Sequence, residues 1–178
     1  MFEKLPESYE TLVKTIEEYN SKKCWKPHQE STMAEVRVYK SSIEALRMDI
    51  AKEGALIYTA FRQFVDDNKN LYSYSLHNTL CGKFTRYNGV FPKVRKDGSL
   101  VLKTWSDRGE GNYEQGESVV IPKDFIYDQE EYKFRRIKEN LEKRKDHYLL
   151  AIKSTEDILD SHKKELVKIK EELKAMES

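Results

Sequence analysis

Several features that would reveal a function are absent from this sequence or scarce in it. Only two of its 178 residues are cysteines, Cys24 and Cys81, which argues against a disulfide-stabilised scaffold and predicts free thiols. No segment approaches the roughly 18 apolar residues of a membrane-spanning helix. Residues 1–7 lack the basic and apolar parts of a signal peptide. We therefore expect a cytoplasmic protein, in the host cytoplasm if it is phage-encoded, that has no membrane partner.

The motifs of common enzyme classes are also missing. The sequence contains no Walker loop, no G-x-G-x-x-G, no H-E-x-x-H and no G-x-S-x-G. The short segment Gly109-Glu110-Gly111 lacks the rest of any phosphate-binding pattern. Catalytic groups can assemble from distant positions, so an enzyme stays an alternative. The absence of motifs favours a non-enzymatic role without an obligatory cofactor.

Charge of both signs is abundant instead. Lys and Arg number 32 and Asp and Glu 31, which leaves a formal net charge of +1. This balance argues against an acidic mimic of DNA and against a generally basic nucleic-acid binder. The mean hydropathy of −0.80 is low for a compact globule but typical of long helices with solvated faces.

The C-terminal segment, residues 126–178, has the clearest pattern. It contains no Pro or Gly beyond Asp128, and two series of mostly apolar residues repeat every seven positions. The first series is Ile152, Leu159, Leu166 and Leu173. The second is Phe134, Leu141, Tyr148, Thr155, His162, Ile169 and Met176. Together they predict the a/d positions of one long helix that packs against other helices.

We call six of these residues the seam: Ile152, Leu159, His162, Leu166, Ile169 and Leu173. His162 is the polar member. A single polar residue on such a surface can set register or partner number, and a buried neutral histidine would make association sensitive to pH. The ordinary alternative is a half-exposed histidine at the edge of the helix.

Two N-terminal segments are predicted to be helical. In residues 1–30, a helix starts near Pro6, a favoured first-turn residue, and runs to about position 20–22, followed by a connector. In residues 31–82, Ser31 or Thr32 caps a second helix that reaches position 64–67. A short helix over 71–80 follows, and Gly82 is well placed to end it.

Residues 83–125 change in character and predict a small β-rich head. Short β-like runs cover 83–87, 90–95, 99–105 and 118–121, and a polar loop covers 107–117. The dipeptides Asn88-Gly89 and Asp97-Gly98 supply the positive φ angles of tight hairpin turns. Pro92 restricts the second run to a sheet edge or a bulge.

These elements predict an α+β fold: long antiparallel helices in a coiled-coil-like stalk, with a small antiparallel β-sheet head inserted between them. At about 1.5 Å per residue, the C-terminal helix is about 75 Å long and the second helix about 50 Å. Part of the seam therefore needs another partner. The first helix or a second copy of the chain, as a homodimer, would serve equally well.

A basic and aromatic patch lies in the head. Residues 83–108 carry seven cations against two acids, a net charge of +5. The members of the patch are Lys83, Arg86, Tyr87, Phe91, Lys93, Arg95, Lys96, Lys103, Trp105 and Arg108. Cations can neutralise phosphates and aromatic rings can stack on bases, and the 95–98 turn resembles the wing of a winged helix. The simpler interpretation is a small aromatic core with cations on its outer face.

Histidine and cysteine occur in two pairs with the same spacing. Cys24 precedes His28 by four residues, and His77 precedes Cys81 by four. Together these four residues would supply a tetrahedral Cys₂His₂ zinc site. The usual short Cys-x₂₋₄-Cys pair is missing, however, and the two pairs are far apart in sequence. A thiol beside a surface histidine, without metal, is the simpler alternative.

The leading hypothesis is a non-enzymatic interaction protein that binds and modulates a larger macromolecular complex through its head and stalk. Its size and composition suit an adaptor or inhibitor of the kind that phages encode as accessory proteins. The alternative is a nucleic-acid-binding protein that uses the basic patch and oligomerises through its helices.

Overall fold

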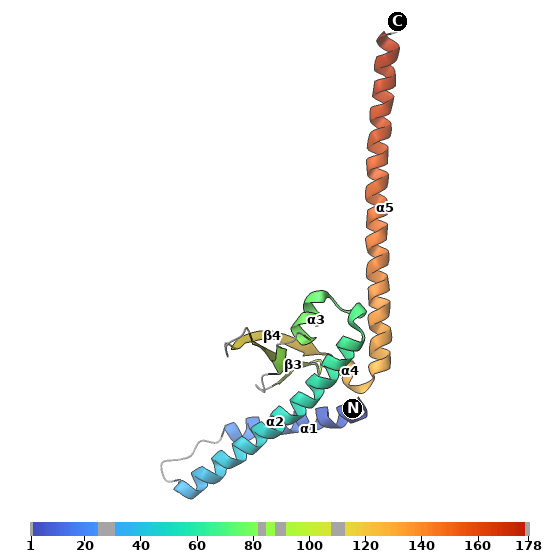
Figure 1. Ribbon diagram of the computed structural model, residues 1–178. Coiled ribbons are helices and arrows are strands. Elements are labelled where there is room, and N and C mark those ends of the chain that lie inside the picture. The colour runs from blue at the N-terminus through green and yellow to red at the C-terminus, as the bar shows by residue number, and fades with distance from the viewer. Residues whose placement is uncertain (1, 25–30, 82–84, 88–91, 108–112, 177–178) are drawn as a thin grey trace. The chain divides into compact units, whose positions relative to one another are not determined.

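The computed structural model describes residues 2–24, 31–81, 85–87, 92–107 and 113–176 (Figure 1). For residues 85–87, 105–107 and 113–117 only the backbone is described. The chain divides into two compact units, Met1–Lys133 and Phe134–Ser178.

Unit 1 begins with an antiparallel pair of helices. A short 3₁₀ turn, η1 (Phe2–Lys4), leads into α1 (Leu5–Lys23), which has Pro in its first turn. The second helix, α2 (Met33–Asp67), starts at a capping box: the Thr32 hydroxyl accepts from the Glu35 amide at 3.3 Å, and the Glu35 carboxylate accepts from the Thr32 amide at 2.7 Å. The two helices pack against each other along α1. Their bounds agree with those predicted from the sequence.

The short helix α3 (Tyr74–Cys81) follows α2 through a 3₁₀ turn, η2 (Lys69–Leu71). Leu80 of α3 is fully buried. The Tyr58 hydroxyl on α2 donates to the Leu80 carbonyl at 3.1 Å. These contacts fix the end of α3 against the C-terminal half of α2.

A four-stranded antiparallel sheet completes the unit. Its strands are β1 (Thr85–Tyr87), β2 (Lys93–Val94), β3 (Leu100–Asp107) and β4 (Tyr113–Ile121). β3 is central: β4 pairs along one side, and β1 and β2 pair with different parts of the other. Alternate residues of β3 and β4, including Leu100, Leu102, Val119 and Ile121, are buried, as the two-residue period of a strand requires.

The sheet differs from the sequence prediction at two points. β4 begins at Tyr113, inside the segment expected to be a polar loop, because pairing with β3 extends the ladder whatever the local propensity. β1 and β2 both run antiparallel to β3 and so in the same direction. They therefore do not form the hairpin expected at Asn88-Gly89, which itself lies outside the described residues. β2, just after Pro92, is an edge strand as predicted.

The turn between β2 and β3 has the predicted left-handed glycine. Gly98 has φ +78°, and its carbonyl accepts a 2.7 Å hydrogen bond from the Tyr9 hydroxyl on α1. A Cβ at this position would lie 2.6 Å from the Lys123 side chain. That side chain can move, so the backbone conformation is the larger obstacle to substitution.

Gly98→Ala should therefore lower the free energy of unfolding by about 1–2 kcal/mol, the cost of placing an L-residue in the left-handed region. Lys96→Ala, at an exposed position of the same turn, is the matched control and should change stability by less than about 0.5 kcal/mol. Urea denaturation measures both. Equal stabilities for the two variants would show that the turn is not strained.

The core of unit 1 centres on a short helix that the sequence did not predict, α4 (Lys123–Tyr127). Phe125 is fully buried, and its ring lies edge-on against Phe61 and Phe64 of α2 at centroid distances of 4.9 and 5.1 Å. Tyr132, in the first turn of α5 (Gln129–Met176), lies 5.6 Å from it. Helices and sheet thus share one apolar core.

Unit 2 is the remainder of the 48-residue helix α5. Every side chain from Leu141 to Met176 is exposed in the single chain. The α+β fold with long helices and a small antiparallel sheet is confirmed. Among the helices that the structure describes, none is long and apolar enough to cross a membrane.

Candidate functional site

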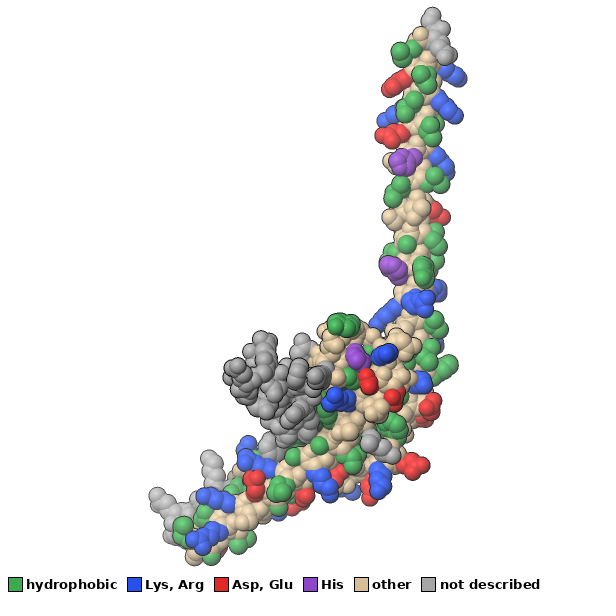
Figure 2. Space-filling view, in the orientation of Figure 1, with side chains coloured by type: hydrophobic (Ala, Val, Ile, Leu, Met, Phe, Trp, Pro, Cys, Tyr) green, Lys and Arg blue, Asp and Glu red, His purple; other side chains and the backbone are tan. Residues whose placement is uncertain are grey.

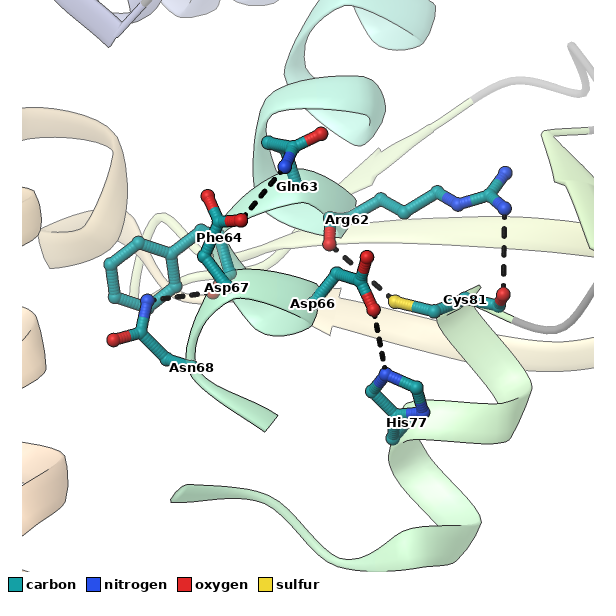
Figure 3. A network of polar contacts seen from close by, with 8 residues as sticks. All are labelled: Arg62, Gln63, Phe64, Asp66, Asp67, Asn68, His77 and Cys81. Atoms are coloured by element: carbon teal, nitrogen blue, oxygen red, sulfur yellow. Dashed lines mark hydrogen bonds and ion pairs between the residues drawn. The ribbon is translucent and has the colours of Figure 1, made fainter. Parts of the chain in front are cut away.

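One polar cluster joins α3 to the end of α2 (Figure 3). His77 Nε2 lies 2.9 Å from Asp66 Oδ1. The Cys81 thiol lies beside them, and one ligand atom from each of the three residues falls within 4.8 Å of the other two. We call these residues the Asp66–His77–Cys81 group. His77 and Cys81 share a face of α3 because they are four residues apart.

Arg62, which also lies on α2, forms hydrogen bonds with Cys81 of this cluster. The Cys81 thiol donates to the Arg62 carbonyl at 3.5 Å, and the Arg62 guanidinium donates to the Cys81 carbonyl at 3.5 Å. Burial raises the pKa of the Cys81 thiol; the Asp66 carboxylate adds to this, and the Arg62 charge opposes it. The Cys81 thiol thus donates a hydrogen bond, and a metal ion would have to displace its proton in order to bind the sulfur.

The structure brings together half of the zinc set that the sequence suggested. His77 and Cys81 meet, but their third partner is Asp66. Cys24 is exposed at the C-cap of α1, where its thiol donates to the Asn20 carbonyl at 3.3 Å, and it belongs to no ligand cluster in the described part of the chain. His28 lies outside the described residues.

The basic patch is only partly described. Lys93, Arg95 and Lys96 are exposed around the β2–β3 turn, and Lys103 is half-buried. Lys83, Phe91 and Arg108 lie outside the described residues, and the side chains of Arg86, Tyr87 and Trp105 are not described. The patch therefore has three exposed cations among the residues whose side chains the structure describes.

The carboxylate of Asp97, in the same turn, already accepts hydrogen bonds. Asp97 Oδ1 accepts from the Ser99 amide at 2.9 Å and from its hydroxyl at 2.7 Å. These hydrogen bonds, with a smaller contribution from Arg95, lower the pKa of Asp97. The carboxylate thus stays charged and is used to shape the turn.

The seam is a row of exposed residues along α5 that are apolar except for His162. Its five apolar residues are between 51% and 56% exposed, and Figure 2 shows hydrophobic side chains recurring along this helix. A shallow hollow lined by Tyr148, Ile152, Thr155 and Leu159, with Ala151 and Glu156, lies at its start. Tyr148, Ala151, Ile152 and Thr155 have the i, i+3, i+4, i+7 spacing of a hole that receives a side chain of a facing helix.

Both heptad series continue together only from Tyr148 onward. With Ile152, Leu159, Leu166 and Leu173 at the a positions, the preceding a positions are Lys145 and Lys138. Upstream, α5 carries ion pairs instead, such as Arg136 to Glu139 at 2.8 Å. His162, at a d position, is exposed, and its Nδ1 lies 3.9 Å from a Glu165 carboxylate oxygen.

Comparison with family models, with curated proteins and with solved structures yields no match.

Proposed function

We propose that this chain is a non-enzymatic interaction protein that works as a pair of copies joined through α5. Unit 1 would contact a protein component of a larger complex through the exposed β2–β3 turn. The observation that carries the proposal is the exposed seam. The proposal includes a cytoplasmic location, which the free thiols of Cys24 and Cys81 favour.

An unpartnered α5 is physically unfavourable. Most helical stability in proteins comes from packing an apolar face against a partner. Fully burying one Leu or Ile side chain contributes about 1.5–3 kcal/mol. Residues 148–176 span roughly four heptads, the length at which a sustained a/d pattern indicates a coiled coil. A partner helix for the seam would supply this burial.

One pair of charges beside the seam suits a second copy in parallel orientation. Glu165 is at a g position, and Lys170, five residues later, is at the following e position. In a parallel pair each Glu165 faces Lys170 of the other chain. In an antiparallel pair the g positions from 151 to 172, which hold only Ala, Ile and Glu, would face one another, and so would the e positions, which include Glu156 and Lys170.

Two copies suit the polar d positions. Thr155 and His162 would lie at the interface with their polar atoms close to its edges, where a two-stranded coil leaves them near water. In a larger bundle they would be enclosed and would need internal hydrogen bonds. The polar d positions therefore favour a pair, whereas Leu at a with Ile at d, as at Leu166 and Ile169, is typical of larger bundles.

The functional proposal is tested by affinity capture, using the full chain as bait in lysate of the cells that express it, with and without nuclease. We expect a protein partner that survives nuclease and is lost when Lys93, Arg95 and Lys96 are all changed to Ala. Failure to retain any partner would contradict the proposal.

Nucleic-acid binding is the second candidate function. Lys93, Arg95 and Lys96 are exposed, while the carboxylate of Asp97 accepts hydrogen bonds from Ser99. In that case, nucleic acid would be recovered without nuclease. The triple Ala variant would reduce the slope of log affinity against log salt by about one unit for each lost phosphate contact.

A further inference from the structure

We propose that Asp66, His77 and Cys81 bind one Zn²⁺ ion, with the remaining coordination position open to solvent. The three side chains supply one oxygen, one nitrogen and one sulfur ligand atom, all within 4.8 Å of one another. Asp66 is followed by the turn that ends α2, and the other two residues lie on α3. The ion would therefore connect the two helices.

The donor set selects zinc among common divalent ions. Zn²⁺ accepts thiolate, imidazole and carboxylate ligands, and three protein ligands with a water form a four-coordinate site of the kind that catalytic zinc centres use. Mg²⁺ and Ca²⁺ prefer oxygen ligands only. Around tetrahedral zinc, ligand atoms lie about 3.5 Å apart, given bonds of roughly 2.0–2.3 Å. Asp66 Oδ1 and His77 Nε2, which are 2.9 Å apart, would have to separate slightly, and any separation near the 4.8 Å upper bound would have to shorten.

The supporting structure holds the ligands while leaving access for an ion. Leu80 is buried and its carbonyl is bonded to Tyr58, so the end of α3 is anchored. The side chains of Asp66 and His77 are 58% and 25% exposed, and Cys81 is half-buried. Zinc would replace the Asp66–His77 hydrogen bond and the Cys81 thiol proton, and the proton would leave to solvent.

The test is metal binding by the full chain purified without added metal. One equivalent of Zn²⁺ should bind, and Co²⁺ at the same site should show the charge-transfer absorption of a thiolate–cobalt bond. Cys81→Ser should abolish that band, and Cys24→Ser should keep it. His77→Asn should weaken Zn²⁺ binding by more than the about 10- to 100-fold typical of losing an outer partner of a metal ligand; His147→Asn should leave it unchanged.

Asp66→Asn is the variant least expected to disturb folding, because the Asp66 side chain is the most exposed of the three proposed ligands. It should weaken Zn²⁺ binding while retaining the circular dichroism of the parent chain. The proposal is overturned if less than a tenth of an equivalent binds. It is equally overturned if Cys24→Ser removes the cobalt–thiolate band, since that result would assign the thiolate to Cys24 and not to Cys81.

Discussion

Replacing Phe125 with Ala should lower the free energy of unfolding of unit 1 by about 3–5 kcal/mol, the range for deleting a buried aromatic ring. Phe125 is fully buried. Its ring contacts four other aromatic rings, those of Phe2, Phe61, Phe64 and Tyr132, at centroid distances from 4.9 to 6.3 Å. Removing it opens a cavity where α2, α4 and the first turn of α5 meet.

Urea denaturation followed by tryptophan fluorescence measures this loss. Tyr127→Ala is the matched control, because it removes an aromatic ring from the same helix at a position that is 45% exposed. It should cost about 1 kcal/mol or less, mainly the edge-on contact with Tyr9 at 6.1 Å. Similar losses for the two variants would show that Phe125 is not the centre of the core.

Leu166→Glu should separate the two chains. Each chain loses a buried leucine worth about 1.5 kcal/mol or more, so the pair loses at least about 3 kcal/mol, a rise of more than about 100-fold in the dissociation constant. Two like charges would also face each other in an apolar layer, which adds to the loss. Helix content should fall as well, since α5 depends on its partner for stability.

Sedimentation velocity and circular dichroism report these two effects. Val167→Glu introduces the same charge one residue later, at a b position that points away from a facing helix, and it should leave the mass unchanged. If Leu166→Glu sediments like the parent chain, or if both variants dissociate equally, the seam is not the contact surface.

Local signals made the helices predictable from sequence. Thr32 followed by Glu35 marks the start of α2, and the Asp97-Gly98 turn requires the positive φ that the structure shows. These features depend on neighbours within a few residues. β4 was underestimated because its first residues are held in the strand by pairing with β3. α4 was missed because its five residues are too few for a helical period.

The candidate sites also combine features that were visible in the sequence with features that depend on distant residues. The spacing of His77 and Cys81 on α3 was visible in the sequence, but Asp66 joins them only through the turn at η2, which no periodicity reveals. The seam was recognisable because a heptad repeat is visible within a single segment of the chain. Its partner was not, because the same heptad pattern is expected whether the helix packs within the chain or against a second copy.

Oxidative cross-linking tests the parallel pairing of α5 most directly. In a Cys24→Ser background, Leu173→Cys places a thiol at an a position, where two parallel chains bring their Cα atoms within the roughly 7 Å limit for a disulfide. Glu171→Cys, at an f position, is the control. We expect Leu173→Cys to convert the 21.1 kDa chain almost fully to a covalent species of twice that mass under mild oxidation, with little from the control. Equal or negligible cross-linking of the two variants would contradict the pairing.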